Sequence, residues 1–157
     1  MTKEEINGYS YRVTQASRTE LVVIMYDVTL NYISDSINYF ENENVERFRD
    51  DIKKAQRVIN QLTSALDQTY EISLELMRLY IYMNNVLVRS SIRKEVEGLK
   101  VVVGMIQKLR SAFEKVSEQD KSGPMMINTQ QVYAGLTYSN GGLNEYHDQT
   151  TKRGFTV

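Results

Sequence analysis

The sequence predicts an all-α protein, an antiparallel four-helix bundle with an N-terminal strap and an irregular C-terminal tail. Helix breakers are almost absent from the middle of the chain, because the only proline, Pro124, and five of the eight glycines lie after residue 120. Long helices require such stretches. Within this part of the chain, apolar residues recur at intervals of three and four, which is the spacing of one helix face.

The first predicted helix runs from a capping box at Ser17 and Glu20 to Glu41. In a capping box the serine hydroxyl accepts the glutamate backbone N–H, and the glutamate carboxylate accepts the serine N–H. The polar residues 42–44 can connect this helix to a second one and cap it. The second helix begins at Val45, and its apolar stripe is Val45, Phe48, Ile52, Ala55, Ile59, Leu62 and Leu66.

Two more helices are predicted over residues 71–89 and 93–116, the last with the stripe Val96, Leu99, Val103, Ile106, Leu109 and Phe113. Four helices with short connections favour an antiparallel bundle, since each stripe then finds neighbours. The expected organisation is a strap over residues 1–16, a bundle over 17–117 and a largely irregular tail over 118–157. The tail either stays solvated or docks Val132, Tyr133, Leu136 and Tyr138 on the bundle or on a partner.

Composition argues against several classes of function. The 19 basic and 20 acidic residues give a net charge of -1, which makes nucleic acid an unlikely main partner. Cysteine is absent, and no apolar run approaches the length of a membrane span, so a cytoplasmic protein is expected. The single histidine, His147, lies in the predicted tail, and no phosphate-binding loop or metal-ligand spacing occurs. We therefore expect no enzyme activity, no catalytic residue, no metal and no cofactor.

The helices predicted over residues 17–41 and 71–89 each carry apolar residues on two faces. One interpretation is that both faces pack against neighbours inside the bundle; another is that the second face binds a partner. In the first of these helices the faces are Leu21, Ile24, Met25, Val28 and Tyr32, and Val22, Tyr26, Leu30, Ile33 and Ile37. In the other helix the stripe Ile72, Leu76, Leu79, Tyr80, Met83 and Val86 lies opposite Leu74, Met77, Ile81 and Val88.

Several motifs in this order resemble the flagellin-specific secretion chaperones of the FliS family. They are the run from Ala16 to Asp27, Lys54 to Ile59 followed by Leu62, Leu79-Tyr80-Ile81-Tyr82-Met83 followed by Leu87, and Leu109 to Phe113. The resemblance covers about Tyr9 to Val116. The chain departs from the family at Arg18, Ser91 and Phe113, where proline, asparagine and tryptophan are usual.

The resemblance implies a bundle that binds the disordered C-terminal segment of flagellin, prevents premature polymerisation and helps deliver flagellin to the export gate. It also implies that the strap can cover part of the groove. The candidate partner-binding residues are Tyr9, Tyr11, Val22, Tyr26, Ile33, Leu74, Met77, Ile81 and Val88. The alternative is a structural homo-oligomer without a flagellin client, in which the second stripes of two copies bury each other in a homodimer.

Overall fold

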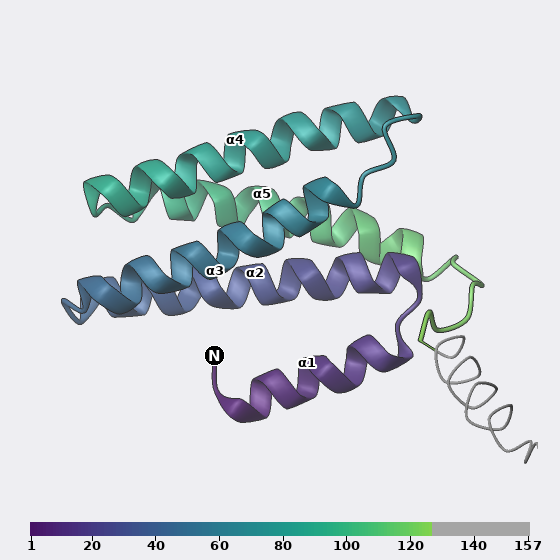
Figure 1. The fold of residues 1–157 in the computed structure, drawn as a ribbon, viewed down its shortest axis with the longest axis horizontal. Coiled ribbons are helices and arrows are strands. Elements are labelled where there is room, and N and C mark those ends of the chain that lie inside the picture. The colour runs from purple at the N-terminus through teal and green to yellow at the C-terminus, as the bar shows by residue number, and fades with distance from the viewer. Residues whose placement is uncertain (127–157) are drawn as a thin grey trace, which may run out of the picture.

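The structure is a computed structural model that describes residues 1–126 (Figure 1). Over these residues the chain forms five helices and no strand, which confirms the predicted all-α class. The helices are α1 (Lys3–Gln15), α2 (Arg18–Glu41), α3 (Val45–Ser64), α4 (Glu71–Arg93) and α5 (Glu97–Ser117).

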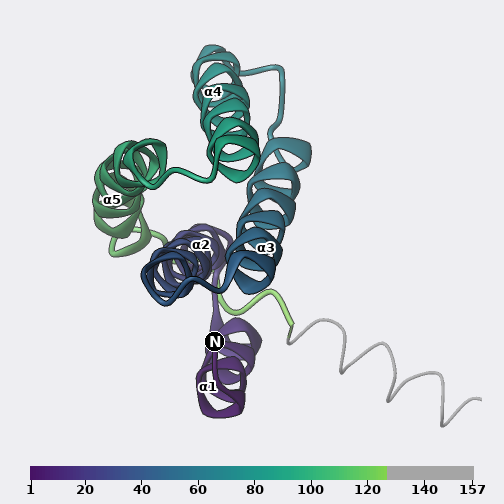
Figure 2. The same cartoon turned by 90° about the vertical axis from the view of Figure 1, so that its left-hand side faces the viewer.

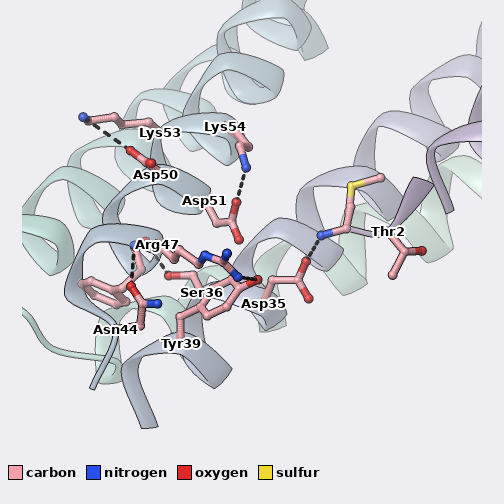
Figure 3. Close-up of polar contacts among 12 residues, drawn as sticks. Thr2, Asp35, Ser36, Tyr39, Asn44, Arg47, Asp50, Asp51, Lys53 and Lys54 are labelled. Carbon is pink, nitrogen blue, oxygen red and sulfur yellow. Dashed lines mark hydrogen bonds and ion pairs between the residues drawn. The ribbon is translucent and has the colours of Figure 1, made fainter. Parts of the chain in front are cut away.

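The predicted capping residues are the N-caps of α2 and α3. The Ser17 hydroxyl accepts the Glu20 N–H at 3.3 Å, and the Ser17 N–H donates to the Glu20 carboxylate at 2.8 Å. Asn44 caps α3, because its side-chain oxygen accepts the backbone N–H of Arg47 at 3.1 Å (Figure 3). These two helices begin where the sequence predicts.

Two features differ from the sequence-based expectation. A helix, α1, occupies most of the predicted strap, and a second capping box starts it: Thr2 accepts the Glu5 N–H at 3.2 Å and donates its own N–H to Glu5 at 2.7 Å. In addition, α4 continues to Arg93, four residues further than predicted. It ends at Lys94, which adopts the left-handed conformation (φ 56°) that is usually reserved for glycine.

The helices α2 to α5 enclose one core, and successive helices run in opposite directions (Figures 1 and 2). Helix α2 packs on α3 and α5, and α4 packs on the same two helices. Helix α1 lies outside this arrangement, against α2. None of the described helices is long and apolar enough to cross a membrane.

The core is mostly aliphatic but contains several buried polar groups, among them a pair of tyrosine hydroxyls. The hydroxyls of Tyr26 on α2 and Tyr80 on α4 form a hydrogen bond inside it. Burial raises the pKa of both tyrosines, so both hydroxyls stay neutral. The Tyr26 ring also meets the edge of Phe113 on α5, with ring centroids 5.7 Å apart. The remaining fully buried large side chains are Ile33, Phe48, Ile52, Ile59, Met83, Leu87, Leu99, Val102 and Ile106.

Gly98, near the start of α5, lies in close contact with α4. A Cβ atom added at Gly98 would lie 2.5 Å from the Ser90 hydroxyl and 2.9 Å from Cγ1 of Val86. Ser90 is fully buried, so its side chain has little room to move. The absence of a side chain at Gly98 therefore sets the spacing of these two helices.

We expect Gly98→Ala to lower the free energy of unfolding by about 1–3 kcal/mol, because the new methyl group overpacks the α4–α5 contact. Gly104→Ala is the matched control in the same helix, since nothing lies within 4 Å of its Cβ position. That change should be neutral or stabilise the protein by up to about 1 kcal/mol. Urea unfolding of both variants measures the difference, and equal stabilities would contradict the proposed close contact.

Candidate functional site: two apolar surfaces

The two apolar faces of α2 have different neighbours. Tyr26 and Ile33 are only 1% and 0% exposed and lie in the core. Val22, Leu30 and Ile37 pack around them. The opposite face lies toward α1, although Met25 and Tyr32 on it also pack against the core. Helix α2 therefore has neighbours on both of its apolar sides.

A groove of about 490 Å³ lies between α1 and the outer face of α2; we call it the α1 groove. Apolar side chains from both helices line most of it, together with Val58 of α3. Those from α1 are Ile6, Tyr9 and Val13, and those from α2 are Leu21, Ile24, Met25, Val28 and Tyr32. Tyr9 and Val13 of the predicted strap therefore share a groove with the apolar outer face of α2.

Three side chains spaced four residues apart along α2 hold α1 in place by polar contacts. Asp27 accepts a hydrogen bond from Arg12 at 3.0 Å, and Asn31 donates to the Tyr9 hydroxyl at 2.8 Å. Asp35 pairs with the amino group of Met1 (Figure 3). We call these contacts the α1 ladder. They fix the position of α1 along α2.

The first member of the ladder is shared with α5. Nε of Arg110 donates to Asp27 at 2.5 Å, and this contact raises the pKa of Arg110. Arg110 also binds Glu114 at 2.9 Å. Because Asp27 is paired with Arg110 in any case, departure of α1 would not leave its carboxylate without a cation.

A second groove, of about 350 Å³, lies between the start of α2 and the end of α3. We call it the α2–α3 groove. Leu21 and Met25 line both grooves, so the two are neighbours. The other lining residues are Arg18, Val22, Leu62, Ala65, Leu66, Tyr80, Phe113 and Met125.

Residues 118–126 fold back onto the corner between α1 and α2. The Thr19 hydroxyl donates to Asp120, and the Met125 N–H donates to the carbonyl of Ala16 at 3.1 Å. Hydrogen bonds from Ser122 and Thr19 hold the pKa of Asp120 below its usual range. Residues 127–157, including the apolar side chains predicted to dock, lie outside the described part of the chain.

The outer face of α4 forms the second apolar surface. Leu74, Ile81 and Val88 are 44%, 50% and 45% exposed, and Met77 between them is half-buried. Tyr70 and Ile92 extend the row at its two ends and are also exposed. We call these six residues the α4 stripe.

The predicted core stripe of α4 is only partly correct. Leu76, Tyr80 and Met83 are buried, but Ile72 and Leu79 are exposed. The core side of α4 is completed instead by Leu87 and by two buried serines, Ser73 and Ser90. Ile72 and Leu79 therefore lie outside the buried part of the helix surface.

The candidate partner-binding residues therefore fall into three places. Tyr9 and Val22 line the α1 and α2–α3 grooves, and Tyr11 is 71% exposed on α1. Tyr26 and Ile33 are in the core, where a partner cannot reach them without opening it. The four candidates on α4 share the α4 stripe, on the far side of the core from α1 (Figure 2). The candidates did not include residues of the α1 groove such as Leu21, Met25 and Tyr32. The second apolar face of α2 was the sequence signal that could have identified them.

Among residues 1–126 no group of three or more histidines, cysteines, aspartates and glutamates is placed to hold a metal ion. What the surfaces offer is apolar area at helical spacing, which suits the binding of an amphipathic segment.

Comparison with known proteins agrees with the motifs. The sequence model of the family described as "Flagellar protein FliS" matches residues 3–120. The chain belongs to the FliS family. The match spans all five helices of this FliS chain and ends at Asp120, so residues 121–157 lie beyond it. The FliS chain is also 28% identical over 109 residues to the flagellar secretion chaperone FliS of Bacillus subtilis (strain 168), covering 69% of this chain and 82% of that protein.

The α1 ladder yields a prediction about local opening. Asn31→Ala combined with Asp35→Ala removes two of its three contacts, each worth about 0.5–1.5 kcal/mol. Amide hydrogen exchange in α1 should accelerate by roughly tenfold, whereas exchange in α2 to α5 should not change. Asn38→Ala, an exposed change on the same helix, is the control. Unchanged exchange in α1 would mean that apolar contacts alone hold it.

Proposed function

We propose that this FliS chain is a cytoplasmic flagellar secretion chaperone, without enzyme activity, that binds the disordered C-terminal segment of flagellin. By covering that segment it prevents premature polymerisation and helps deliver flagellin to the flagellar export apparatus. Family membership and the name of the B. subtilis relative support this role. The structural observation that carries it is the α4 stripe, an exposed apolar row on a single helix.

The α4 stripe suits a client that folds as it binds. Its residues have the helical spacing of side chains that contact a bound amphipathic helix, as seen at Leu74, Met77, Ile81 and Val88. The flexible thioether of Met77 can adapt to different side chains. A disordered segment loses conformational entropy when it becomes helical on this surface, and apolar burial offsets that loss.

In this proposal α2 to α5 act as an antiparallel four-helix bundle that stays folded, and α1 acts as the strap. Helix α1 covers the outer face of α2, so that face becomes available to a client only when α1 moves. No residue of α1 is buried, and its docking therefore rests on the α1 groove and the α1 ladder. The grooves next to Leu21 and Met25 would then form a second client surface.

Replacing Met77 or Ile81 by glutamate should abolish binding of a flagellin C-terminal peptide, because the client would have to bury an unpaired charge. Helicity and melting temperature should hardly change, since Ile81 is exposed and Met77, although half-buried, is not among the side chains packed against the core. Isothermal titration calorimetry and circular dichroism measure the two properties. Val101→Glu, at an exposed apolar position on α5, is the matched control and should leave binding intact. Unfolding of the Met77 or Ile81 variants would contradict an open surface.

A chain that begins at Ala16 should bind the same peptide more tightly than the full chain, because α1 no longer competes for the outer face of α2. Each 1.4 kcal/mol of α1 docking free energy weakens the apparent affinity about tenfold. Calorimetric titration of both chains, matched for helicity, compares the affinities. Weaker binding by the shortened chain would mean that α1 contacts the client, and equal affinities would reject the lid.

A further inference from the structure

Residues 118–126, which follow α5, run back to the N-terminal part of the chain; we call them the C-terminal clasp. They lead from the end of α5 to the corner where α1 ends and α2 begins (Figure 1). The family model matches the chain only as far as Asp120, so residues 121–126 lie outside the part that the family describes. The contacts that these residues make are therefore not accounted for by family membership.

A turn at Asp120 gives the clasp its shape. The Asp120 carboxylate accepts the Ser122 N–H at 2.9 Å and the Ser122 hydroxyl at 2.5 Å, as aspartate often does with the residue two positions further on. Asp67, between α3 and α4, makes the same turn with Thr69 at 3.0 and 2.7 Å. Asp120 in addition accepts the hydroxyl of Thr19, in the first turn of α2. The turn in the clasp is thus also fastened to α2.

The clasp lies on the hinge between α1 and α2. Only Ala16 and Ser17 connect these helices, and each is 4% exposed. The capping box keeps Ser17 with α2, so a movement of α1 away from α2 must begin with backbone rotation at Ala16 or before it. The Met125 N–H donates to the Ala16 carbonyl at 3.1 Å. The clasp is therefore bonded to the residue about which α1 would have to swing.

The last two residues of the clasp reach both apolar grooves. Met125 lines the α2–α3 groove, and Met126 lines the α1 groove. Leu21 and Met25 of α2 line both grooves, and we call these two residues the shared wall. In Figure 2 the clasp passes between α1 and α3 on its way to this wall. Flexible thioether side chains suit irregular apolar grooves of this kind.

Helix α1 cannot cover the shared wall alone. It lies over the α1 groove only, and it buries no residue of its own. Leu21 and Met25 are half-buried, since the α2–α3 groove on their other side is covered by no helix of the bundle. The clasp supplies the second cover, because it brings one methionine to each side of the wall.

We propose that the C-terminal clasp is a second strap, which holds the hinge of α1 in its docked position and covers the shared wall against a client. Exposure of the outer face of α2 then requires two events, release of the clasp and departure of α1. Holding of the hinge does not depend on a client. Competition for the shared wall rests on the proposed function.

Asp120→Ala in the full chain tests the hold on α1. Within residues 1–126 the hydrogen bonds of Asp120 run to Ser122 and to the start of α2, so this change touches no residue of α1. Amide hydrogen exchange at Met125 should accelerate, because its N–H loses the Ala16 carbonyl when the clasp leaves. Exchange in α1 should accelerate by about threefold to tenfold, as expected for the loss of one or two hydrogen bonds. Exchange in α3 and α4 should not change.

Asp67→Ala is the matched control, because it removes the same kind of turn at a site far from α1 in sequence. Exchange in α1 should then remain at the wild-type rate. Thr19→Val removes the other partner of the clasp bond and leaves the Ser122 turn intact, so it should also accelerate exchange in α1. The double variant should exchange no faster than Asp120→Ala alone, since both changes break the same bond. Circular dichroism verifies that every variant is folded.

Calorimetric titration with a flagellin C-terminal peptide tests the competition. Asp120→Ala should bind the peptide about threefold to tenfold more tightly than the wild-type chain, because docking of the clasp no longer subtracts from client binding. Asp67→Ala should bind like wild type.

Two results would overturn the hold on α1: a wild-type Met125 amide that exchanges without protection, or equal exchange of α1 in the Asp120→Ala and Asp67→Ala variants. Faster exchange of α1 with unchanged peptide affinity would overturn the competition for the shared wall and leave the hold on α1 established. A peptide that binds no form of the chain would reject the proposed function instead, and the exchange measurement, which needs no client, would still decide the clasp.

Discussion

The structure depends on the burial of α2 from two sides. One face of α2, with Tyr26 and Ile33, meets α3 and α5 in the core, and the other meets α1. A helix that is apolar on both faces cannot sit at the edge of a small protein without exposing one of them. The N-terminal helix supplies the missing cover, and residues 118–126 close the corner between α1 and α2.

Helix α4 has the same two-sided composition but lacks a second cover. Its inner face contributes Leu76, Tyr80, Met83 and Leu87 to the core, while the α4 stripe on its outer face remains exposed within residues 1–126. Both helices therefore have a second apolar face to cover. For α2 the chain's own residues cover it, whereas for α4 it stays exposed within residues 1–126. An intermolecular contact, with a client or with a second copy, is the natural way to bury such a row.

Local signals predicted much of the fold. Three of these signals depend only on residues close together in the sequence: the cap at Ser17, the cap at Asn44 and the apolar stripe of α3. The structure has all three. The Thr2–Glu5 box that starts α1 was an equally local signal, but residues 1–16 were predicted only as a strap, with no helix assigned to them. The end of α4 gave no such signal, because Lys94 adopts a conformation that its residue type does not favour.

The site was harder to predict, because periodicity identifies faces but not their neighbours. Both faces of α2 have helical spacing, so nothing in the sequence showed that Tyr26 and Ile33 face the core rather than a partner. The α1 ladder joins side chains of two helices, so the pattern within either helix alone could not predict that Asp27, Asn31 and Asp35 pair with Arg12, Tyr9 and the amino group of Met1.

The contacts of α1 also differ in kind from those of the other helices. Helices α2, α3 and α4 each bury six residues, whereas α1 buries none and is held by a partly open groove and polar contacts at its edge. Polar contacts at a protein surface are worth little net free energy, because water replaces them when they break. Asp27 keeps Arg110 as a partner when α1 leaves, which lowers the cost further. Helix α1 thus covers the outer face of α2 only in part, and with a small part of the free energy that holds the core.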